Sequence, residues 1–450
     1  MAIYSLTEIL EATGGRLLLK GAENFSGISI DSRTIREAQL FVALKGERFD
    51  GHDFLEQALN SGGAGALVSL PPLIPHRGKS IIYVSNTLKA LQGIARYRRL
   101  SRKIRVVAVT GSNGKTTTKE MIAKILSSRY DVLSSRGNLN NHIGLPLSLT
   151  ELDRQDMAVL EMGASRQGDI DDLCQIAIPN TGVITNIGPA HLEGFGSVQG
   201  VFETKMEMLR YVDSVVLNHD DGMIRKVPEE KLKGKRVVTF AIKSDADVRA
   251  ESIVYGERGI DFNVILKEGK EFHLHLPLYG LFNIYNALAA IAVGMLYGIP
   301  EDSVVEALGT FRGVPQRLEI DRLKGATVIS DLYNANPASM EEALKELVHL
   351  KKGRAIAVLG DMLELGAYAE AAHREIGRLI ATLPIDVVIA VGDYTRYIKE
   401  ELNGRGSRIE FHHVDSPEGA GRLLIDLIRE GDTVLIKGSR GMKMEEVLKV

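Results

Sequence analysis

The sequence predicts an α/β protein built from three domains, and three observations support this prediction. The chain has 450 residues, more than one hydrophobic core usually holds. Short apolar segments with the character of strands alternate with helical patterns along most of it. One of those segments runs into a glycine turn with a lysine, TGSNGKTT at 110–117. A strand, a glycine turn and a helix in that order are typical of a parallel sheet that binds a mononucleotide.

Residues 1–100 form the first predicted domain. They combine short strands such as LFVAL with helical stretches such as DFLEQALNSG, which indicates a small α/β unit. The basic run RYRRLSRKIR ends this region. Because the chain as a whole is not basic, we expect this run to be a solvated helix end and linker rather than a binding patch.

Residues 101–313 form the predicted central domain, and residues 314–450 form the C-terminal domain. The central part contains near-continuous apolar segments such as VVAVTG and DMAVLEMG, which are typical of a parallel sheet covered on both faces. Two-residue alternation over 247–279 predicts an antiparallel appendage to that sheet. After FRGVPQR, further strands and helices predict a smaller, Rossmann-like sheet. Two such sheets joined at a hinge usually bind ligand between the carboxyl ends of their strands.

The overall charge and the cysteine content exclude several classes of protein. The net charge is -3, so nothing points to binding of nucleic acid or an anionic membrane. Cys174 is the only cysteine, which rules out an intrachain disulfide and favours a reducing compartment. The apolar stretch from Ala287 is too short and too rich in glycine for a membrane span, and the N-terminus lacks a signal peptide. We therefore expect a cytoplasmic protein without membrane insertion and, since no coiled-coil heptads occur, a monomer.

The glycine turn has the chemistry of a phosphate-binding loop. Backbone N–H groups at the start of the following helix favour an anion, Lys115 adds a positive charge, and the hydroxyl of Thr116 can bind Mg2+. Val109 stands where the standard loop has its first glycine, so an ordinary strand-to-helix turn is the alternative. The residues predicted to hold ATP here are Gly111, Ser112, Asn113, Gly114, Lys115, Thr116 and Thr117.

Two further residues are candidate metal ligands. Glu161 ends an apolar strand, where its carboxylate can reach a metal held by Thr116. A buried carboxylate is costly unless it is paired, so a structural ion pair is the alternative. His191 follows another strand and a glycine–proline turn. For a single histidine, a role in the core or in a helix cap is the alternative.

The shortened loop resembles that of the Mur ligase family, the ATP-dependent amide-forming enzymes of bacterial cell-wall precursor synthesis. The resemblance covers essentially the whole chain. It implies a uridine-diphosphate-binding N-terminal domain, an ATP-binding central domain and a C-terminal domain that closes on the nucleotide. Further segments resemble the family's motifs in the same order, namely NLNNHIGLP at 138–146, EMGAS at 161–165, TNIGPAHLEGFGS at 185–197, FNIYNALAA at 282–290, PQRLE at 315–319 and SDLYNANP at 330–337.

The first domain and three later segments narrow the implied activity. The segment DSRTIREAQLFVALKGERFDGHDF resembles the substrate domain of the two ligases that add the later residues of the stem peptide. YNANP, GDMLELG and KGSRGMKMEEV resemble the ligase that adds D-alanyl-D-alanine. The sibling that adds lysine or meso-diaminopimelate typically has D-N-P-R in place of NANP.

The resemblance therefore implies that ATP and Mg2+ drive the joining of D-alanyl-D-alanine to the terminal carboxylate of a UDP-N-acetylmuramoyl-tripeptide. The reaction would pass through an acyl phosphate and release ADP and phosphate. The sibling ligase and a nucleotide-gated binding protein are the alternatives. Whether the third residue of the stem peptide is lysine or diaminopimelate is not readable from the chain, because the enzyme adds beyond that residue.

The resemblance also implies a nucleotide site shared between two domains. Asn283, which lies three residues before Asn286 on a predicted helix, would bind adenine. Arg317 and Asp331 would reach phosphate and ribose from the C-terminal domain. Phe282 stands where the family commonly has histidine. On residue type alone, the asparagines fit a polar helix start and the charged residues fit surface ion pairs.

The cell-wall substrates would contact three groups of residues by the same resemblance. The uridine nucleotide would be bound by Asp31, Ser32, Arg33, Lys45 and Gly46. The peptide carboxylate would pass Asn138, Asn140, Asn141 and His142, although such asparagine-rich runs often form only a loop. The incoming dipeptide would be bound by Tyr333, Asn334, Asn336 and Pro337.

Lys205 is the last implied site residue. An ammonium has no lone pair and repels a cation, so a plain lysine cannot ligate a metal. In the family, a lysine at the matching helix position carries CO2 as a carbamate, which would supply a carboxylate-like ligand beside His191. Met206 departs from the family's small residue at that place, and a protonated lysine facing phosphate or solvent is the alternative. The implied catalytic residues are Lys115, His191 and Lys205.

Overall fold

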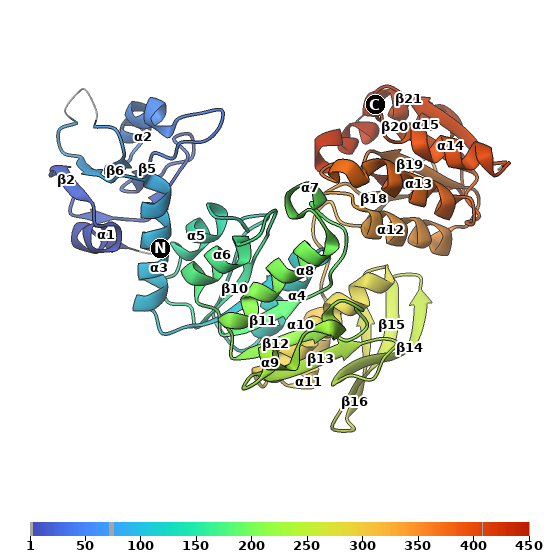
Figure 1. The fold of residues 1–450 in the computed structure, drawn as a ribbon, viewed down its shortest axis with the longest axis horizontal. Coiled ribbons are helices and arrows are strands. Elements are labelled where there is room, and N and C mark those ends of the chain that lie inside the picture. The colour runs from blue at the N-terminus through green and yellow to red at the C-terminus, as the bar shows by residue number, and fades with distance from the viewer. Residues whose placement is uncertain (1–2, 72–75, 407, 450) are drawn as a thin grey trace.

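The structure is a computed structural model that describes residues 3–71, 76–406 and 408–449. Within these residues the chain folds around three large β-sheets that follow one another along the sequence. Figure 1 shows three bodies, with the N-terminal one in blue, the central one in green and yellow, and the C-terminal one in orange and red. The predicted α/β fold of three domains is confirmed.

The N-terminal sheet has the strand order β2-β7-β6-β5-β4. Strands β4 to β7 are parallel, and β2 pairs antiparallel with β7. The loops that follow β4 and β5 therefore leave the sheet at the same edge. The elements are β1 (Tyr4–Ser5), α1 (Leu6–Thr13), β2 (Arg16–Leu19), β3 (Asn24–Phe25), β4 (Ile28–Ser29), β5 (Leu40–Val42), η1 (Gly51–Phe54), α2 (Leu55–Asn60), β6 (Gly65–Val68), β7 (Ser80–Tyr83) and α3 (Thr87–Ser101).

The central sheet has the strand order β16-β15-β14-β13-β12-β11-β8-β10-β9. Strands β8 to β13 are parallel, and β14 joins them parallel to β13. Strands β15 and β16 then continue the sheet with antiparallel pairing, which forms the predicted antiparallel appendage. The strands are β8 (Arg105–Thr110), β9 (Val132–Ser134), β10 (Met157–Glu161), β11 (Thr181–Ile184), β12 (Ser214–Asn218), β13 (Arg236–Ala241), β14 (Val248–Gly256), β15 (Gly259–Leu266) and β16 (Glu271–Leu276).

Helices cover both faces of the central sheet because its strands are apolar on both sides. Helices α4, α10 and α11 share one core with it, and α5, α6 and α8 share the other. The helices are α4 (Lys115–Leu126), α5 (Gly144–Leu149), α6 (Asp169–Ala177), α7 (Leu192–Phe195), α8 (Val198–Met206), η2 (Glu207–Arg210), η3 (Ile224–Lys226), α9 (Glu229–Leu232), α10 (Leu281–Leu296) and α11 (Glu301–Gly309).

The C-terminal sheet has the strand order β17-β18-β22-β19-β20-β21, and all of its pairs are parallel except β17 with β18. Apolar cores lie on both of its faces. The elements are β17 (Glu319–Leu323), β18 (Ala326–Asp331), α12 (Pro337–Leu350), β19 (Ala355–Gly360), η4 (Gly366–Tyr368), α13 (Ala369–Ile380), β20 (Val387–Val391), α14 (Arg396–Gly404), β21 (Glu410–Val414), α15 (Pro417–Leu427), β22 (Thr433–Lys437), η5 (Arg440–Met442) and η6 (Met444–Leu448).

The basic run at the end of α3 is solvated only in part, because Arg96, Lys103 and Arg105 are exposed, as predicted, while two of its arginines are buried. Arg98 and Arg99 are 3% and 7% exposed. Arg98 lies over the ring of Tyr4 and donates to the carbonyl of Leu152, while Arg99 donates to the carbonyl of Ala177. These guanidinium groups satisfy buried carbonyls of the central domain, so α3 joins the first two domains as a packed helix.

None of the helices in the described ranges is long and apolar enough to cross a lipid bilayer.

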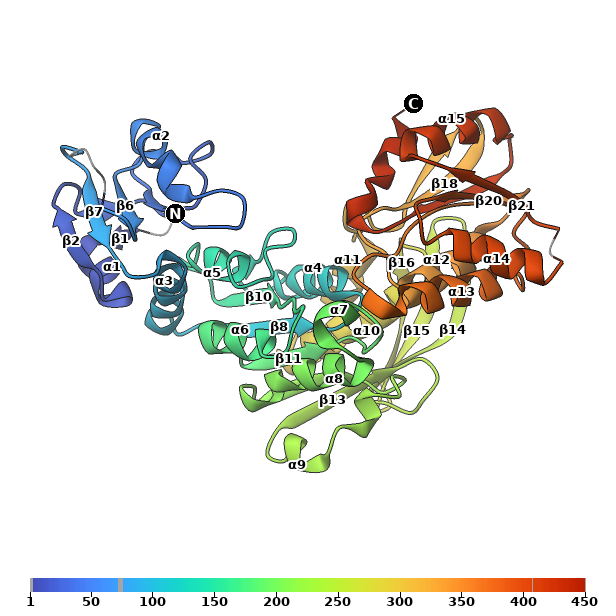
Figure 2. The same cartoon turned by 45° about the horizontal axis from the view of Figure 1, so that its top comes forward.

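Helix α12 packs against the central domain, where Figure 2 shows the C-terminal body above the yellow strands. The ring of its His349 lies 3.7 Å from that of Tyr255 in β14. One turn earlier, Glu346 is 4% exposed and accepts a hydrogen bond from the backbone of Gly280. Its Oε1 is buried without a hydrogen-bond partner among the described residues. Burial raises the pKa of Glu346 to about 7, and the charge of nearby Glu342 acts in the same direction.

We expect Glu346 to make stability depend on pH. Between the ordinary pKa of an unfolded glutamate and about 7, the folded chain binds a proton that the unfolded chain releases, so stability falls as pH rises through this window. Glu346→Gln keeps the group neutral and should raise the free energy of unfolding at about pH 8 by about 1–3 kcal/mol, with a much smaller effect at about pH 5. Urea unfolding at both pH values measures this.

Glu341→Gln is the matched control, because Glu341 is exposed on the same helix and pairs only with Lys345 at 2.7 Å. It should change stability little at either pH. A Glu346→Gln variant with the same stability difference at both pH values would contradict the assignment.

Candidate active site

The carboxyl edges of the central and C-terminal sheets face each other across a cleft of about 990 Å³. Loops that follow β8 to β12 line one side, and loops that follow β18 and β19 line the other. Parallel sheets usually bind ligands at this edge. The predicted site residues that line the cleft are Ser112, Asn113, Gly114, Lys115, Thr117, Asn138, Asn140, Asn141, His142, Glu161, His191, Asn283, Arg317, Asp331, Tyr333, Asn334 and Asn336.

The glycine turn sits at the bottom of this cleft, and its two glycines are required by their surroundings. Gly111 has a φ of +147°, and a Cβ there would lie 1.9 Å from Oγ1 of Thr185. Gly114 has a φ of +79°, and a Cβ there would lie 2.3 Å from Oδ1 of Asn286. Any side chain would push the turn away from its supports. Helix α4 begins directly afterwards at Lys115, as the sequence predicts.

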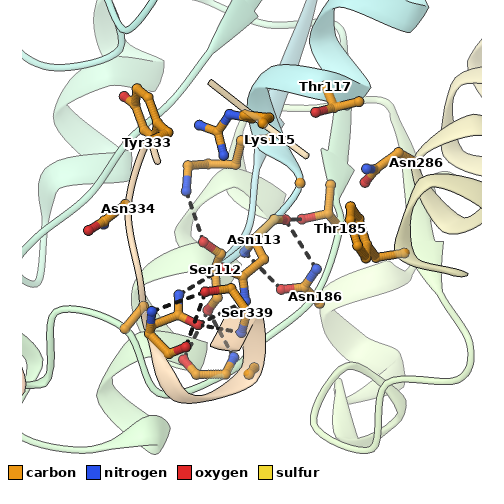
Figure 3. A pocket seen from close by; sticks show the side chains of 18 of the residues that line it. Ser112, Asn113, Lys115, Thr117, Thr185, Asn186, Asn286, Tyr333, Asn334 and Ser339 are labelled. Carbon is orange, nitrogen blue, oxygen red and sulfur yellow. Dashed lines mark hydrogen bonds between the residues drawn. The ribbon is translucent and has the colours of Figure 1, made fainter. Parts of the chain in front are cut away.

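Residues that follow β11 hold the glycine turn from outside. The backbone N–H of Asn113 donates to Oδ1 of Asn186 at 2.9 Å, and the amide of Asn186 donates back to the carbonyl of Asn113 at 3.1 Å. The hydroxyl of Thr185 donates to the same carbonyl at 2.6 Å. Figure 3 shows Asn113 between Thr185 and Asn186 on one side and Tyr333 and Asn334 on the other. The loop is therefore fixed before any ligand arrives.

Lys115 lies folded over the turn that it follows. Its Nζ donates to the carbonyls of Gly111 and Ser112 at 2.9 and 3.1 Å. Burial lowers the pKa of Lys115, the charge of Arg317 lowers it further, and the carboxylate of Glu161 acts to raise it. The Nζ of this lysine therefore lies beside backbone oxygens, and an anionic ligand can replace them as its hydrogen-bond acceptors.

Glu161 ends β10 and fits the role of a cation ligand. It is 2% exposed, and its Oε1 accepts a hydrogen bond from the amide of Asn140 at 2.7 Å. Its Oε2 is buried with no hydrogen-bond partner among the described residues. A buried carboxylate oxygen without a donor is costly unless a cation is bound there. The alternative for Glu161 was a structural ion pair. Its hydrogen-bond partner is the neutral amide of Asn140 rather than a cation.

The side chains alone do not form a closed metal cage. In residues 3–71, 76–406 and 408–449, no group of three or more His, Cys, Asp or Glu side chains could hold a metal ion. The hydroxyl of Thr116, a predicted ligand, accepts a hydrogen bond from Arg317 at 3.1 Å. A Mg2+ ion bound at Glu161 would therefore depend on further oxygens, as nucleotide phosphates provide.

His191 and Lys205 come from the segment between β11 and β12. His191 starts α7 with a φ of 51° and lines the cleft. Its Nδ1 lies 2.6 Å from Oε2 of Glu364 in the C-terminal domain. Lys205, on α8, is 2% exposed, and its Nζ lies 5.9 Å from the ring centroid of Phe195. Burial, with a further contribution from the charge of Lys115, lowers the pKa of Lys205 to about 7.

The two asparagines of α10 lie on one helix face, as predicted. The amide of Asn286 donates to Oδ1 of Asn283 at 3.1 Å, and Asn286 accepts from the hydroxyl of Thr118 in α4. Asn283 in turn donates to the carbonyl of Tyr279 at 2.7 Å. Asn286 is thus a structural link between α10 and α4, while Asn283 and Phe282 line the cleft.

The C-terminal domain reaches the glycine turn through two contacts. The guanidinium of Arg317 donates to Thr116 and lies 4.0 Å from the ring centroid of Tyr333. The side-chain amide of Asn336 donates to Oδ1 of Asn113 at 2.7 Å. Both contacts are polar and pass directly between the two domains.

Asp331 ends β18 and is paired with a buried lysine. Lys437, 1% exposed at the end of β22, donates to the carboxylate of Asp331 and to the carbonyl of Asn334 at 3.0 Å. The same lysine therefore supports both the predicted ribose ligand and the predicted dipeptide loop. Sequence reasoning did not single out Lys437, although it opens the segment KGSRGM.

The asparagine-rich loop has both structural and cleft-facing members. Oδ1 of Asn141 accepts from the backbone N–H of Ile143 and Gly144 at the start of α5. Asn141 therefore holds the backbone that leads into α5, in keeping with the alternative that such a run forms only a loop. Asn140 holds Glu161, and Asn138 and His142 line the cleft beside them.

The predicted uridine site lies on the N-terminal sheet and does not line the cleft. Asp31 follows β4 and Lys45 follows β5, so both belong to the carboxyl edge of parallel strands. Arg33 donates twice through its guanidinium to Asp31, which holds the pKa of that carboxyl at about 2. Ser32 donates to Gln57, and the N–H of Gly46 donates to the carbonyl of Phe49. The structure brings these residues to one edge of one sheet.

Sequence reasoning missed several residues that shape the cleft. Thr185 and Asn186 stand in a segment that resembles a family motif, and their polar side chains directly after a buried strand were an available signal. No comparable signal marks Lys437 or Glu364, because their partners are far away in the sequence.

Comparison with known proteins places three regions of the chain in one family. Residues 24–99 match the description "Mur ligase family, catalytic domain", residues 109–294 match "Mur ligase middle domain", and residues 316–440 match "Mur ligase, glutamate ligase domain". The UDP-N-acetylmuramoyl-tripeptide--D-alanyl-D-alanine ligase of Bacillus subtilis (strain 168) is 36% identical over 430 residues, which cover 94% of this chain and 92% of that ligase.

Solved structures agree with the sequence comparison. A crystal structure of MurF from Acinetobacter baumannii has a TM-score of 0.91 at 32% identity, covering 99% of this chain and 98% of that one. MurF from Thermotoga maritima, solved in complex with ADP, has a TM-score of 0.83 at 31% identity, covering 94% of this chain and 96% of that one. From these matches along its whole length, the chain belongs to the Mur ligase family.

Proposed function

We propose that this chain joins D-alanyl-D-alanine to the terminal carboxylate of a UDP-N-acetylmuramoyl-tripeptide, with conversion of ATP to ADP and phosphate. The observation that carries the proposal is the cleft itself, in which Lys115 and Glu161 face the loop of Tyr333, Asn334 and Asn336. Relatives named for this reaction, at 36% identity over nearly the whole chain, support the choice of substrates. The NANP sequence at 334–337 supports it over the sibling that adds lysine or diaminopimelate.

In the first half of the reaction, the peptide carboxylate attacks the γ-phosphorus of ATP. The bond between this phosphorus and the bridging oxygen breaks, and ADP leaves. The amides of the glycine turn and the ammonium of Lys115 stabilise the charge on the phosphate oxygens. Arg317 would add a second cation from the C-terminal domain, because its guanidinium already reaches Thr116.

In the second half, the amine of the dipeptide attacks the carbonyl carbon of the acyl phosphate. A C–N bond forms, the C–O bond to phosphate breaks, and the amine loses a proton. The loop of Tyr333, Asn334 and Asn336 would hold the dipeptide, since the contact of Asn336 with Asn113 places this loop beside the nucleotide turn. Asn283 and Asp331 would bind the adenosine, and Asn138, Asn140 and His142 would line the path of the carboxylate.

The metal and the nucleotide substrate complete the proposed site. Glu161, Thr116, His191 and Lys205 would hold Mg2+, which supplies a Lewis acid that neutralises phosphate charge when bound. Residues 1–100 would bind the uridine diphosphate through the edge of Asp31 and Lys45. Residues 101–313 would bind ATP, and residues 314–450 would bind the incoming dipeptide. We place this reaction in the cytoplasm and in a monomer; the single, unpaired Cys174 supports a reducing compartment.

A nucleotide-gated binding protein is the second candidate from another class. The cross-domain contacts of Arg317 and Asn336 would suit a switch that closes on ATP. Such a protein would hydrolyse ATP without an acceptor and an amine, whereas a ligase releases ADP only when both are present. An ATPase assay over UDP-muramoyl peptides and amines separates the two.

The first expected outcome concerns Lys115. Lys115→Ala should lower ligation by at least about 10²–10³-fold, because the transferred phosphate loses its cation, and leave the circular dichroism spectrum unchanged. Lys124→Ala is the control, since Lys124 is on the same helix, is not among the residues that line the cleft, and donates to the carbonyl of Thr310 at 3.4 Å. Nearly unchanged turnover in a folded Lys115→Ala variant would contradict the role of Lys115 in stabilising the transferred phosphate.

The second expected outcome concerns the amine. With a UDP-muramoyl-tripeptide as acceptor, D-alanyl-D-alanine should be ligated far better than any single amino acid, because the chain has NANP at 334–337. Product formation is measured by mass spectrometry across a panel of amines. Faster ligation of lysine or diaminopimelate to a UDP-muramoyl-dipeptide would identify the chain as the sibling enzyme.

The third expected outcome concerns a carbamate on Lys205, formed when the neutral amine adds CO2 and releases a proton. Burial lowers the pKa of the Lys205 amine to about 7, which makes its neutral form available near physiological pH and supports this step. Lys205→Ala should be nearly inactive and partly rescued by a short carboxylic acid, and buffer depleted of CO2 should lower wild-type activity. Glu203→Ala, an exposed residue of the same helix, is the control. A density map with a bare amine beside loaded metal sites would refute the carbamate.

A further inference from the structure

Glu364 of the C-terminal domain lies against His191 of the central domain. Its Oε2 is 2.6 Å from Nδ1 of the imidazole. A backbone hydrogen bond of 3.4 Å from the N–H of Glu193 to the carbonyl of Glu364 joins the same two turns. Both residues line the cleft. The contact therefore forms only when the two domains lie together.

The turn that carries Glu364 is firmly held. The N–H of Leu363 donates to the hydroxyl of Ser439 at 2.8 Å, and the N–H of Met362 donates to Nε2 of the buried His373 at 3.1 Å. The segments GDMLELG and KGSRGM thus form one structure at the carboxyl ends of β19 and β22.

Both partners have left-handed backbone, which non-glycine residues seldom adopt. The φ angles are 62° at Glu364 and 51° at His191. Such backbone is strained in L-residues, and residues of this kind cluster at functional sites. The side chains are 60% and 36% exposed, so the ion pair itself adds little to the free energy of domain closure. The main consequence of the contact between Glu364 and His191 must therefore be the orientation of the imidazole ring.

The contact decides which ring nitrogen of His191 carries the proton. A carboxylate only accepts hydrogen bonds, so Nδ1 of a neutral His191 must be the donor and Nε2 must carry the lone pair. Histidines that bind metals usually donate their second ring N–H to such an acceptor.

We propose that Glu364 is a positioning residue for His191, supplied by the C-terminal domain on closure, which fixes the imidazole with Nε2 free to bind the metal. This rests on the proposed role of His191 as a ligand. It means that the metal site becomes complete only when the domain that carries the dipeptide has closed. The chemical step is thereby coupled to closure of the domain that binds the second substrate.

The test compares Glu364→Ala and Glu364→Gln in the full chain. Glu364→Ala should lower kcat about 10–100-fold and raise the Mg2+ concentration needed for half-maximal rate, with KM for the UDP substrate unchanged. Glu364→Gln should recover part of the loss, because its amide oxygen still accepts from Nδ1–H. Glu370→Gln, an exposed residue paired with Arg374, should behave as wild type.

Two further measurements separate positioning from a general structural role. Nitrogen-15 NMR with labelled histidine and a bound non-hydrolysable ATP analogue should show the Nδ1–H tautomer of His191 in the wild type and lose it in Glu364→Ala; His191→Ala identifies the signal. In a His191→Ala background, Glu364→Ala should cost nothing more. An Nε2–H tautomer in the wild type, or an undiminished loss in that background, would overturn the proposal.

Discussion

The whole site depends on how closely the glycine turn approaches its neighbours. Thr185 and Asn286 stand so near to Gly111 and Gly114 that even a methyl group would displace the turn. Because Asn186 and Thr185 bind the backbone of Asn113 from outside, the turn is fixed before a ligand arrives, and with it the N–H donors at the start of α4. Preorganised donors of this kind stabilise developing charge without reorganisation. The cross-domain contacts of Arg317 and Asn336 depend in turn on the same loop, since its residues are their partners.

Two kinds of contact join the central and C-terminal domains, and they differ in how easily they can open. Around the cleft the contacts are polar, from Asn336 to Asn113 and from Glu364 to His191, and water can replace each partner. At α12 the buried carboxyl of Glu346 lies against Gly280 and has to gain water when the domains separate. The cleft is therefore the side at which the domains can part, while α12 lies nearer the hinge.

Much of the fold follows from local sequence, whereas the finer parts of the site do not. Long apolar runs such as the one that forms β8 predicted parallel strands, and two-residue alternation predicted the hairpin of β15 and β16. The edge strand β9 was not predicted, because a strand of 3 residues is too short to show an apolar pattern of its own. Arg98 and Arg99 appeared as solvent-facing charges because their carbonyl partners lie more than fifty residues away. The roles of Lys437 and Glu364 were not predicted for the same reason, since pairing between distant segments leaves no local sequence pattern.

The charges of the cleft already have temporary partners that a nucleotide can replace. Lys115 is bound to backbone carbonyls, Arg317 to the hydroxyl of Thr116, and Lys437 to Asp331. Oε2 of Glu161 is a buried carboxylate oxygen of the cleft without a donor among the described residues, and it is the atom best suited to a cation. Exchange of neutral oxygens for phosphate at Lys115 and Arg317 strengthens both contacts, because charged hydrogen bonds are roughly twice as strong as neutral ones. Much of the desolvation of these cations has thus occurred on folding, so ligand binding gains the stronger contacts at a smaller cost.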